Sequence, residues 1–253
     1  MDTKKVIMIT DCADVAHIEM ELIIEEESKK RGINDVEFKL VPIEEFSILN
    51  AAFLTRLLAE ECQPWTVLSV VINPQRHRSA RIYGEFLNGV RFFGANTWAL
   101  TWAINDLWVK NLYEIHDPWF ITFWWKFVHA PNIAKILADC PFDDFWKSFP
   151  IESLQKLDLN EWSIVHIDNF WLMKIFGNPI SFNDGQKFKI YKNWEYILDA
   201  VFAPRMMSLE DDVRCLYAWS SLNLPELWQV RNKYWYKKID AKIWDIITWE
   251  LIS

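Results

Sequence analysis

Apolar and polar positions along the first half of the chain predict strands that are followed by helices. KVIMIT (residues 5–10) predicts a short buried strand, and apolar residues spaced three and four apart over 11–31 predict a helix that ends before Gly32. Residues 36–41 and 66–72 predict two further strands, with a helix at 47–62 between them. This alternation is typical of an α/β domain with a mostly parallel sheet.

The alternation continues to about residue 142 and then changes. Residues 81–95 predict a hairpin around Asn88-Gly89, followed by a helix at 99–107, a strand at 111–115 and a helix at 130–140. Residues 143–160 are charged and aromatic fragments without a period, so we expect a linker there. From 161 to 253, short alternating segments separated by turns predict a small antiparallel domain, either a β-barrel or a sandwich. The ligand-binding α/β domain is therefore expected at 1–142.

Tryptophan occupies positions where a turn favours glycine, because a bulky side chain disfavours a positive φ. The affected positions are Trp65, Trp119, Trp162, Trp194 and Trp244. The chain has 16 Trp and 6 Gly, whereas average usage of about 7% predicts roughly 18 Gly. We hypothesise that most of these tryptophans are glycine in the native protein, encoded by UGA in a lineage that reads this codon as glycine. A Trp-rich stacking protein is the alternative. Trp102 and Trp249 lie in apolar periodic contexts and fit true tryptophan.

Charge and cysteine usage limit the class of partner. The formal net charge is −8 and no run of Lys or Arg stands out, so we expect a small molecule or a protein as the partner rather than a nucleic acid or a membrane. The four cysteines are scattered without a CxxC pair, which predicts neither a zinc site nor a disulfide framework. No apolar run reaches the length of a membrane span, and the N-terminal one is too short for a secretion signal. We therefore expect a cytoplasmic protein.

Read with glycine at the suspect positions, the sequence contains IVHIDNFG, GANTG, YAGSS and IGDII, together with ITD after the first strand. This ordered set resembles the S-adenosylmethionine (SAM) hydroxide adenosyltransferases, the SAM hydrolases related to the fluorinating and chlorinating enzymes. The likeness extends over nearly the whole chain. It implies hydrolysis of SAM to adenosine and L-methionine without a metal or an organic cofactor. It also implies a homotrimer, with each active site between the α/β domain of one subunit and the barrel of the next.

The resemblance implies a set of ligand contacts. They are Asp11, Asn96, Asp168, Asn169, Phe170, Ser220 and Ser221. Asp11 matches the family's ribose-binding Asp, and Asn96 lies in its adenine-side loop. The Asp168–Phe170 stretch matches the segment that receives the methionine amine and the adenine, and the two serines match the methionine-carboxylate loop. From the residues alone, Asp11 could instead cap the following helix, and Asp168-Asn169 could form an ordinary turn.

The sequence departs from the family pattern where the attacking water is expected. The family's VVDPGVG reads VVINPQR here, so Asn73 replaces the acid and cannot act as a base. Arg78 and Arg81 flank the family's Arg position. The His of TFHGRDIFAP falls on Trp124, and His129 is the nearby imidazole, before a helix start whose macrodipole favours its neutral form. Asn73, Arg78, Arg81 and His129 are thus the candidate catalytic residues, and a packed or capping His129 is the alternative.

Two functions follow from these observations. The first is SAM hydrolysis by a water that is oriented toward C5′ of the ribose, and the second is a non-catalytic sensor that binds SAM or adenosine. A halogenating enzyme is a third, weaker interpretation, because nothing in the sequence identifies a halide pocket. A hydrolase predicts that His129 lies near Asn73 and near Arg78 or Arg81. A sensor predicts that His129 packs against the helix or caps its first turn.

Overall fold

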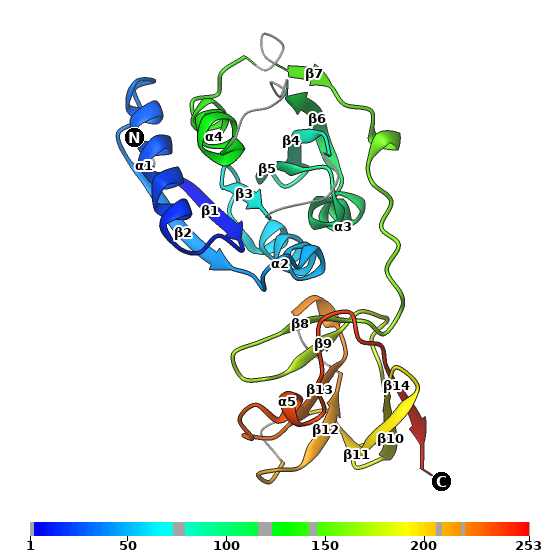
Figure 1. The fold of residues 1–253 in the computed structure, drawn as a ribbon. Coiled ribbons are helices and arrows are strands. Elements are labelled where there is room, and N and C mark those ends of the chain that lie inside the picture. Colours follow the sequence, from blue (N-terminus) through cyan, green and yellow to red (C-terminus); the bar gives the residue numbers. More distant parts are fainter. Residues whose placement is uncertain are drawn as a thin grey trace. The chain divides into compact units, whose positions relative to one another are not determined.

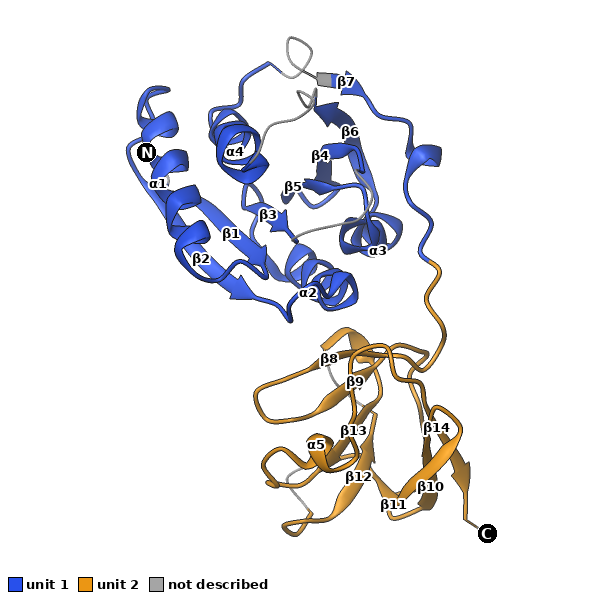
Figure 2. Ribbon diagram, in the orientation of Figure 1, with its two compact units in different colours: residues 1–157 blue, residues 158–253 orange. Residues whose placement is uncertain are grey.

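The computed structural model describes residues 3–72, 79–115, 123–141, 146–205, 209–218 and 221–252. The chain divides into two compact units, unit 1 (Met1–Leu157) and unit 2 (Asp158–Ser253), which Figure 2 shows in different colours. The division falls near the end of the segment expected as a linker. The first part of that segment instead forms a strand of unit 1.

Unit 1 contains a seven-stranded mixed sheet in the order β2-β1-β3-β5-β4-β6-β7 (Figure 1). The strands are β1 (Lys4–Thr10), β2 (Val36–Pro42), β3 (Val67–Val71), β4 (Arg81–Phe86), β5 (Arg91–Ala95), β6 (Val109–Ile115) and β7 (Trp146–Ser148). The pairs β2–β1, β1–β3 and β3–β5 are parallel. The pairs β5–β4, β4–β6 and β6–β7 are antiparallel. The expectation of a mostly parallel sheet is therefore wrong for half of it. The hairpin at Asn88-Gly89 reverses the chain without a helix between β4 and β5.

Helices cover both faces of this sheet (Figure 1). They are α1 (Val15–Lys29), α2 (Ile48–Glu61), α3 (Trp98–Leu107) and α4 (Ala130–Leu137), with a π-helical turn η1 (Trp125–His129) leading into α4. Val6 and Met8 of β1 pack in the core that α1 and α4 cover, and Ile7 and Ile9 pack in the core that α2 and α3 cover. The four helices lie where the apolar spacing predicts them.

Unit 2 contains a second seven-stranded mixed sheet, in the order β14-β10-β11-β12-β13-β9-β8. The strands are β8 (Ile164–Ile167), β9 (Met173–Ile175), β10 (Lys187–Lys192), β11 (Glu195–Ala203), β12 (Arg214–Tyr217), β13 (Glu226–Gln229) and β14 (Ile247–Leu251). Two short helical elements, η5 (Ser221–Asn223) and α5 (Trp235–Lys238), lie between strands. All named pairs are antiparallel except β11–β12, which is parallel. The sheet is thus mixed, where the pattern predicts a purely antiparallel one.

Six tryptophans have a left-handed backbone. They are Trp65 (φ 71°), Trp108 (56°), Trp162 (70°), Trp171 (65°), Trp194 (71°) and Trp244 (85°). They account for six of the 16 non-glycine residues with positive φ in the described part of the chain. The predicted turn geometry is confirmed at Trp65, Trp162, Trp194 and Trp244, whereas Trp119 lies outside the described residues.

Three other tryptophans are packed into the interior. Trp102 is buried in α3 beside Phe53, and its indole N–H donates a hydrogen bond to Asp106 Oδ2 at 3.1 Å. The buried Trp228 and Trp235 donate their indole N–H groups to backbone carbonyls at 3.0 and 2.8 Å. Tryptophan therefore occurs in two structural settings. One is a turn with positive φ, which glycine would adopt with less strain, and the other is a buried position where the indole packs and donates a hydrogen bond.

Candidate functional site

Polar residues follow the carboxyl ends of adjacent parallel strands in unit 1. Thr10 is in register with Pro42 of β2 and with Val71 of β3, so the segments after these three strands begin at one edge of the sheet. Ligands of open α/β sheets bind at such edges. Asp11 lies there, whereas Asn73 and Arg78 lie outside the described residues.

Asp11 fixes the loop between β2 and α2. Its Oδ2 accepts a hydrogen bond from the backbone N–H of Phe46 at 3.0 Å. Asp14, not Asp11, is the N-cap of α1, where its carboxylate accepts from the N–H of Ala16 at 3.1 Å. The capping interpretation of Asp11 is therefore wrong, and its carboxylate stays at the edge of the sheet.

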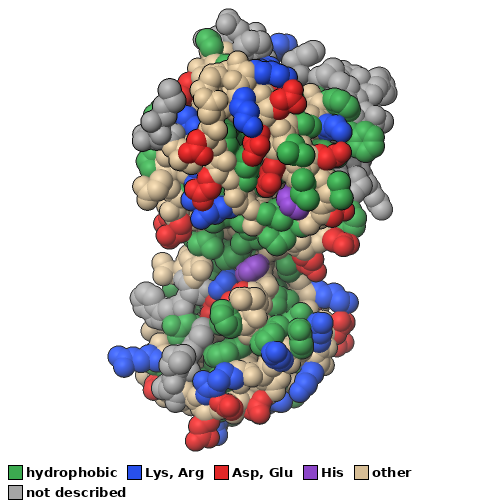
Figure 3. All heavy atoms as spheres, turned by 90° about the vertical axis from the view of Figure 1, so that its left-hand side faces the viewer, with side chains coloured by type: hydrophobic (Ala, Val, Ile, Leu, Met, Phe, Trp, Pro, Cys, Tyr) green, Lys and Arg blue, Asp and Glu red, His purple; other side chains and the backbone are tan. Residues whose placement is uncertain are grey.

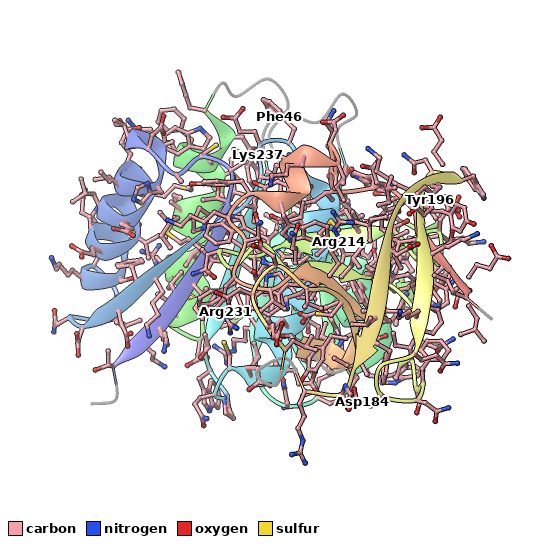
Figure 4. The ribbon with its side chains drawn as sticks, turned by 90° about the horizontal axis from the view of Figure 1, so that it is seen from below. Phe46, Asp184, Tyr196, Arg214, Arg231 and Lys237 are labelled. Carbon is pink, nitrogen blue, oxygen red and sulfur yellow. The ribbon has the colours of Figure 1, made fainter. Side chains whose placement is uncertain are left out.

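Phe46 is a site candidate that the sequence did not reveal. Its φ is 60°, an uncommon value for a bulky residue, and 61% of its surface is exposed (Figure 4). The backbone N–H that Asp11 holds belongs to this same residue. At the carboxyl edge, a carboxylate therefore holds the backbone of a residue whose phenyl ring is exposed. Nothing in the local sequence IEEFS signals this placement.

His129 is enclosed in the core of unit 1. Its Nε2 lies 2.8 Å from the Oγ of the buried Ser69 in β3, and its ring stacks on Phe93 with centroids 4.4 Å apart. Burial, reinforced by the charge of Arg81, lowers the pKa of His129 to about 3. The imidazole is thus neutral as predicted, but the main cause is burial and not the helix macrodipole. A solvent-accessible base at this position, as the sequence allowed, is not what the structure shows.

Arg81 and His129 both contact the indole of Trp124. The Arg81 guanidinium carbon is 4.4 Å from the centroid of the Trp124 ring, and the His129 ring meets the same indole edge-on at 5.2 Å. Arg81 also donates from Nη1 to the Ser79 carbonyl at 3.3 Å. The expected proximity of His129 to an arginine is therefore present, and both groups contact Trp124.

Asn96 holds the chain that leads out of unit 1. Its Nδ2 donates to the Ser153 carbonyl at 3.0 Å, and its Oδ1 accepts from the Gln155 N–H at 2.9 Å. Thr101 Oγ1 donates to the Gln155 carbonyl at 2.9 Å, so α3 fastens the same segment. The contacts that the structure shows for Asn96 are thus structural, and its adenine contact stays a prediction.

In unit 2, Asp168 organises the turn between β8 and β9. Its Oδ1 accepts from the backbone N–H groups of Phe170 and Leu172 at 2.8 and 3.1 Å, and its carbonyl accepts from the Trp171 N–H at 2.9 Å. The turn interpretation is therefore confirmed. Asn169 and Phe170 are both exposed at its tip, so a carboxylate again holds the backbone of a residue whose phenyl ring is exposed.

The loop that contains Ser220 and Ser221 precedes β13. Ser221 begins the turn η5, whose Leu222 and Asn223 both have positive φ, while Ser220 lies outside the described residues. The antiparallel register of β9 and β13 puts this turn and the Asp168 turn at opposite ends of that short strand pair. The Asp168–Phe170 stretch and Ser221 therefore lie in turns that flank the same pair of strands.

A buried ion pair joins the two strands between these turns. Lys174 of β9 and Glu226 of β13 are cross-strand partners and form a direct ion pair, and the Lys174 Nζ lies 3.9 Å from Asp168 Oδ2. Burial, with the Lys174 charge, lowers the pKa of the nearby His166 to about 4. The only signal in the sequence is one lysine inside the apolar run LMKIF.

The described segments show neither a metal site nor a membrane span. They bring together no group of three or more His, Cys, Asp or Glu side chains that could hold a metal ion. Within these same segments, no helix is both long and apolar enough to cross a membrane.

No protein-family model and no curated protein matches this sequence. Several solved structures are similar, among them the following two. An uncharacterized conserved protein from Thermotoga maritima has a TM-score of 0.82 at 14% identity, over 97% of this chain and 100% of that chain. A conserved hypothetical protein from Thermus thermophilus has a TM-score of 0.76 at 13% identity, over 99% of this chain and 100% of that chain. At these identities the likeness establishes a shared mixed α/β fold.

Proposed function

We propose that this protein binds SAM and hydrolyses it to adenosine and L-methionine. The supporting observation is a repeated arrangement, in which a carboxylate accepts a hydrogen bond from the backbone N–H of a phenylalanine whose ring is exposed. Asp11 with Phe46 forms it in unit 1, and Asp168 with Phe170 forms it in unit 2. SAM offers hydroxyl and ammonium groups for carboxylates and a flat adenine for an aromatic face.

The proposed reaction is an in-line displacement at C5′ of the ribose. A water oxygen forms a bond to C5′ while the bond from C5′ to sulfur breaks, and the electron pair leaves with methionine as a neutral thioether. The water then releases a proton to solvent, so SAM and water give adenosine, methionine and one proton. Because the sulfonium charge disappears during the step, a dry site and an oriented water supply much of the rate without a strong base.

Residue roles follow from the resemblance and from the contacts. Asp11 is assigned to the ribose hydroxyls and Asp168 to the methionine ammonium, with Phe170 against the adenine. Ser220 and Ser221 are assigned to the methionine carboxylate. The water is assigned to the segment that includes Asn73 and Arg78, together with Arg81. His129 is not assigned the base, since Ser69, Phe93 and Trp124 enclose it.

That enclosure favours the second candidate function, a sensor that binds SAM or adenosine without turnover. The predicted sensor geometry was a His129 packed beside the helix, and its burial at the start of α4 fits this description. Asn73 and Trp124 stand where the family has its acid and its histidine. A sensor would use the same two carboxylate and phenyl pairs and would return SAM unchanged.

The proposal includes a barrel and a homotrimer in the cytoplasm, as the resemblance implies. Barrel closure is supported by a bridge between Ser163 and Ile246, which precede β8 and β14, the outermost strands of the second sheet. Self-association is supported by Val15, Ile18 and Leu22, exposed on α1 at helical spacing. On the side of unit 1 that carries α1, hydrophobic side chains lie among charged ones (Figure 3).

Incubation with SAM, followed by chromatography for adenosine and methionine, tests the proposal. We expect equal amounts of both products from the full chain and none after replacement of Asp168 by Ala. Calorimetric binding of SAM with no product after prolonged incubation would favour the sensor. Absence of both binding and product would refute both functions.

A further inference from the structure

Lys174 and Glu226 form an ion pair in the interior of unit 2. Their side chains are only 10% and 2% exposed, and the neighbours of Lys174 along β9 are the buried Met173 and Ile175. Removing two charges from water is unfavourable, and apolar residues of similar volume often stabilise a protein as well as such a pair does. Stability alone therefore does not account for a lysine in this apolar strand.

Asp168 lies next to this pair with its two oxygens in different settings. Oδ1 is held by the backbone N–H groups of Phe170 and Leu172, which fixes the orientation of the carboxylate. Oδ2 is 3.9 Å from the Lys174 Nζ, which is an ion-pair distance but too long for a hydrogen bond. Asp168 is thus oriented by the turn, while the lysine makes its close contact with Glu226 instead.

The three side chains carry two negative charges and one positive charge, so the cluster has a net charge of −1 when all three are ionised. We infer that Glu226 is a positioning residue that holds the Lys174 ammonium away from close pairing with Asp168, which leaves that carboxylate open for the ammonium group of a ligand. This inference rests on the proposed function, which supplies the methionine ammonium as that group. Glu226 itself contacts no ligand in this arrangement.

The physical reason is competition between two cations for one carboxylate. Lysine is a compact charge on a flexible stem, and it is already within ion-pair distance of Asp168. If Glu226 loses its charge, Lys174 is expected to turn toward Asp168, a carboxylate that already lies within ion-pair distance. Asp168 is then neutralised from within the protein, and a ligand ammonium gains little from binding there.

The test compares SAM with adenosine, which lacks the ammonium group, by calorimetry on the full chain. In Glu226→Gln we expect SAM affinity to fall roughly tenfold or more, the scale of one charge-assisted hydrogen bond, while adenosine affinity stays unchanged. Equal losses for both ligands would overturn the inference, as would unchanged SAM affinity in the folded variant.

A double variant keeps the test decisive if Glu226→Gln does not fold. Lys174→Met combined with Glu226→Leu replaces the pair by apolar side chains and leaves Asp168 charged without a competing cation. SAM affinity equal to or above that of the unmodified chain supports the inference, and a selective loss of SAM overturns it. If the unmodified chain binds neither ligand, the proposed function fails and the inference fails with it. Binding of both ligands with unaltered SAM affinity in Glu226→Gln refutes the inference alone.

Discussion

Trp194 lies in the two-residue turn between β10 and β11, and its replacement by glycine is expected to stabilise the protein. Asn193 and Trp194 have φ values of 49° and 71°, so both central residues are left-handed, as in the type I′ turns that favour Asn-Gly. The side chain of Trp194 is among the most exposed in unit 2, at 75%. Removing it therefore sacrifices little buried apolar surface.

The magnitude follows from two opposing contributions. A left-handed backbone costs a residue with a Cβ about 1–2 kcal/mol, and glycine loses about 0.5–1 kcal/mol more backbone entropy than alanine on folding. Trp194→Gly should therefore raise the free energy of unfolding by roughly 0.5–1 kcal/mol. Over all six left-handed tryptophans the strain alone sums to about 6–12 kcal/mol, comparable to the stability of about 5–15 kcal/mol of a whole protein.

Urea unfolding of Trp194→Gly measures this change, and Trp235→Gly is the matched control. Trp235 is 1% exposed and its indole N–H donates to the Trp171 carbonyl at 2.8 Å, so its loss should destabilise unit 2 by about 3–5 kcal/mol. A Trp194→Gly variant that is less stable than the unmodified chain would refute the strain argument. UGG codons at 162, 194 and 244 would separately refute the glycine assignment.

Two further predictions concern the site and the core. Replacing Asp11 by Ala should weaken binding of SAM or adenosine by about 1–3 kcal/mol in calorimetry. Replacing Asp14, the N-cap of α1, is the control and should change stability only. Unchanged affinity in the Asp11 variant would remove Asp11 from the site. Burial lowers the pKa of His129 to about 3, so below its unfolded pKa of about 6.5 the unfolded chain binds a proton that the folded chain does not. Stability should therefore fall as pH decreases from about 6.5 toward 3, by up to about 1.4 kcal/mol per pH unit from this residue. Urea unfolding at several pH values measures how steeply the free energy of unfolding changes with pH, and His129→Phe should reduce this slope. His166 contributes to the slope equally in the variant and in the unmodified chain. Equal slopes in the two proteins would contradict a buried, neutral His129.

The local structure of unit 1 was predictable because apolar spacing reports directly on helices and strands. The helix of residues 48–61 and the strand of 67–71 lie within the predicted ranges. Strand direction was not predictable in the same way. A buried strand has the same apolar pattern in a parallel and in an antiparallel pair, so the antiparallel β4–β6 and β6–β7 pairs and the parallel β11–β12 pair left no trace in the sequence, whereas the Asn88-Gly89 turn did predict the β4–β5 hairpin.

The candidate site was predictable only where a residue acts through its own turn. Asp168 lies in a recognisable turn sequence, and the structure confirms that turn. Glu226 depends on Lys174, which is 52 positions earlier, so their contact exists only once the register of β13 and β9 is fixed. His129 shows the same limit, because the strands that supply Ser69 and Phe93 decide whether it is accessible.

The left-handed turn at Trp65 has a consequence for making the protein in the laboratory. This residue is the first tryptophan of the chain, and its N–H donates to the Gly89 carbonyl immediately before β3 begins. If its codon is UGA, an ordinary expression host ends translation at Pro64. The product would contain β1, β2, α1 and α2 but not β3, which pairs with the other edge of β1. Such a fragment exposes the central strand of a parallel sheet as an unprotected edge, and we expect it to aggregate rather than to fold.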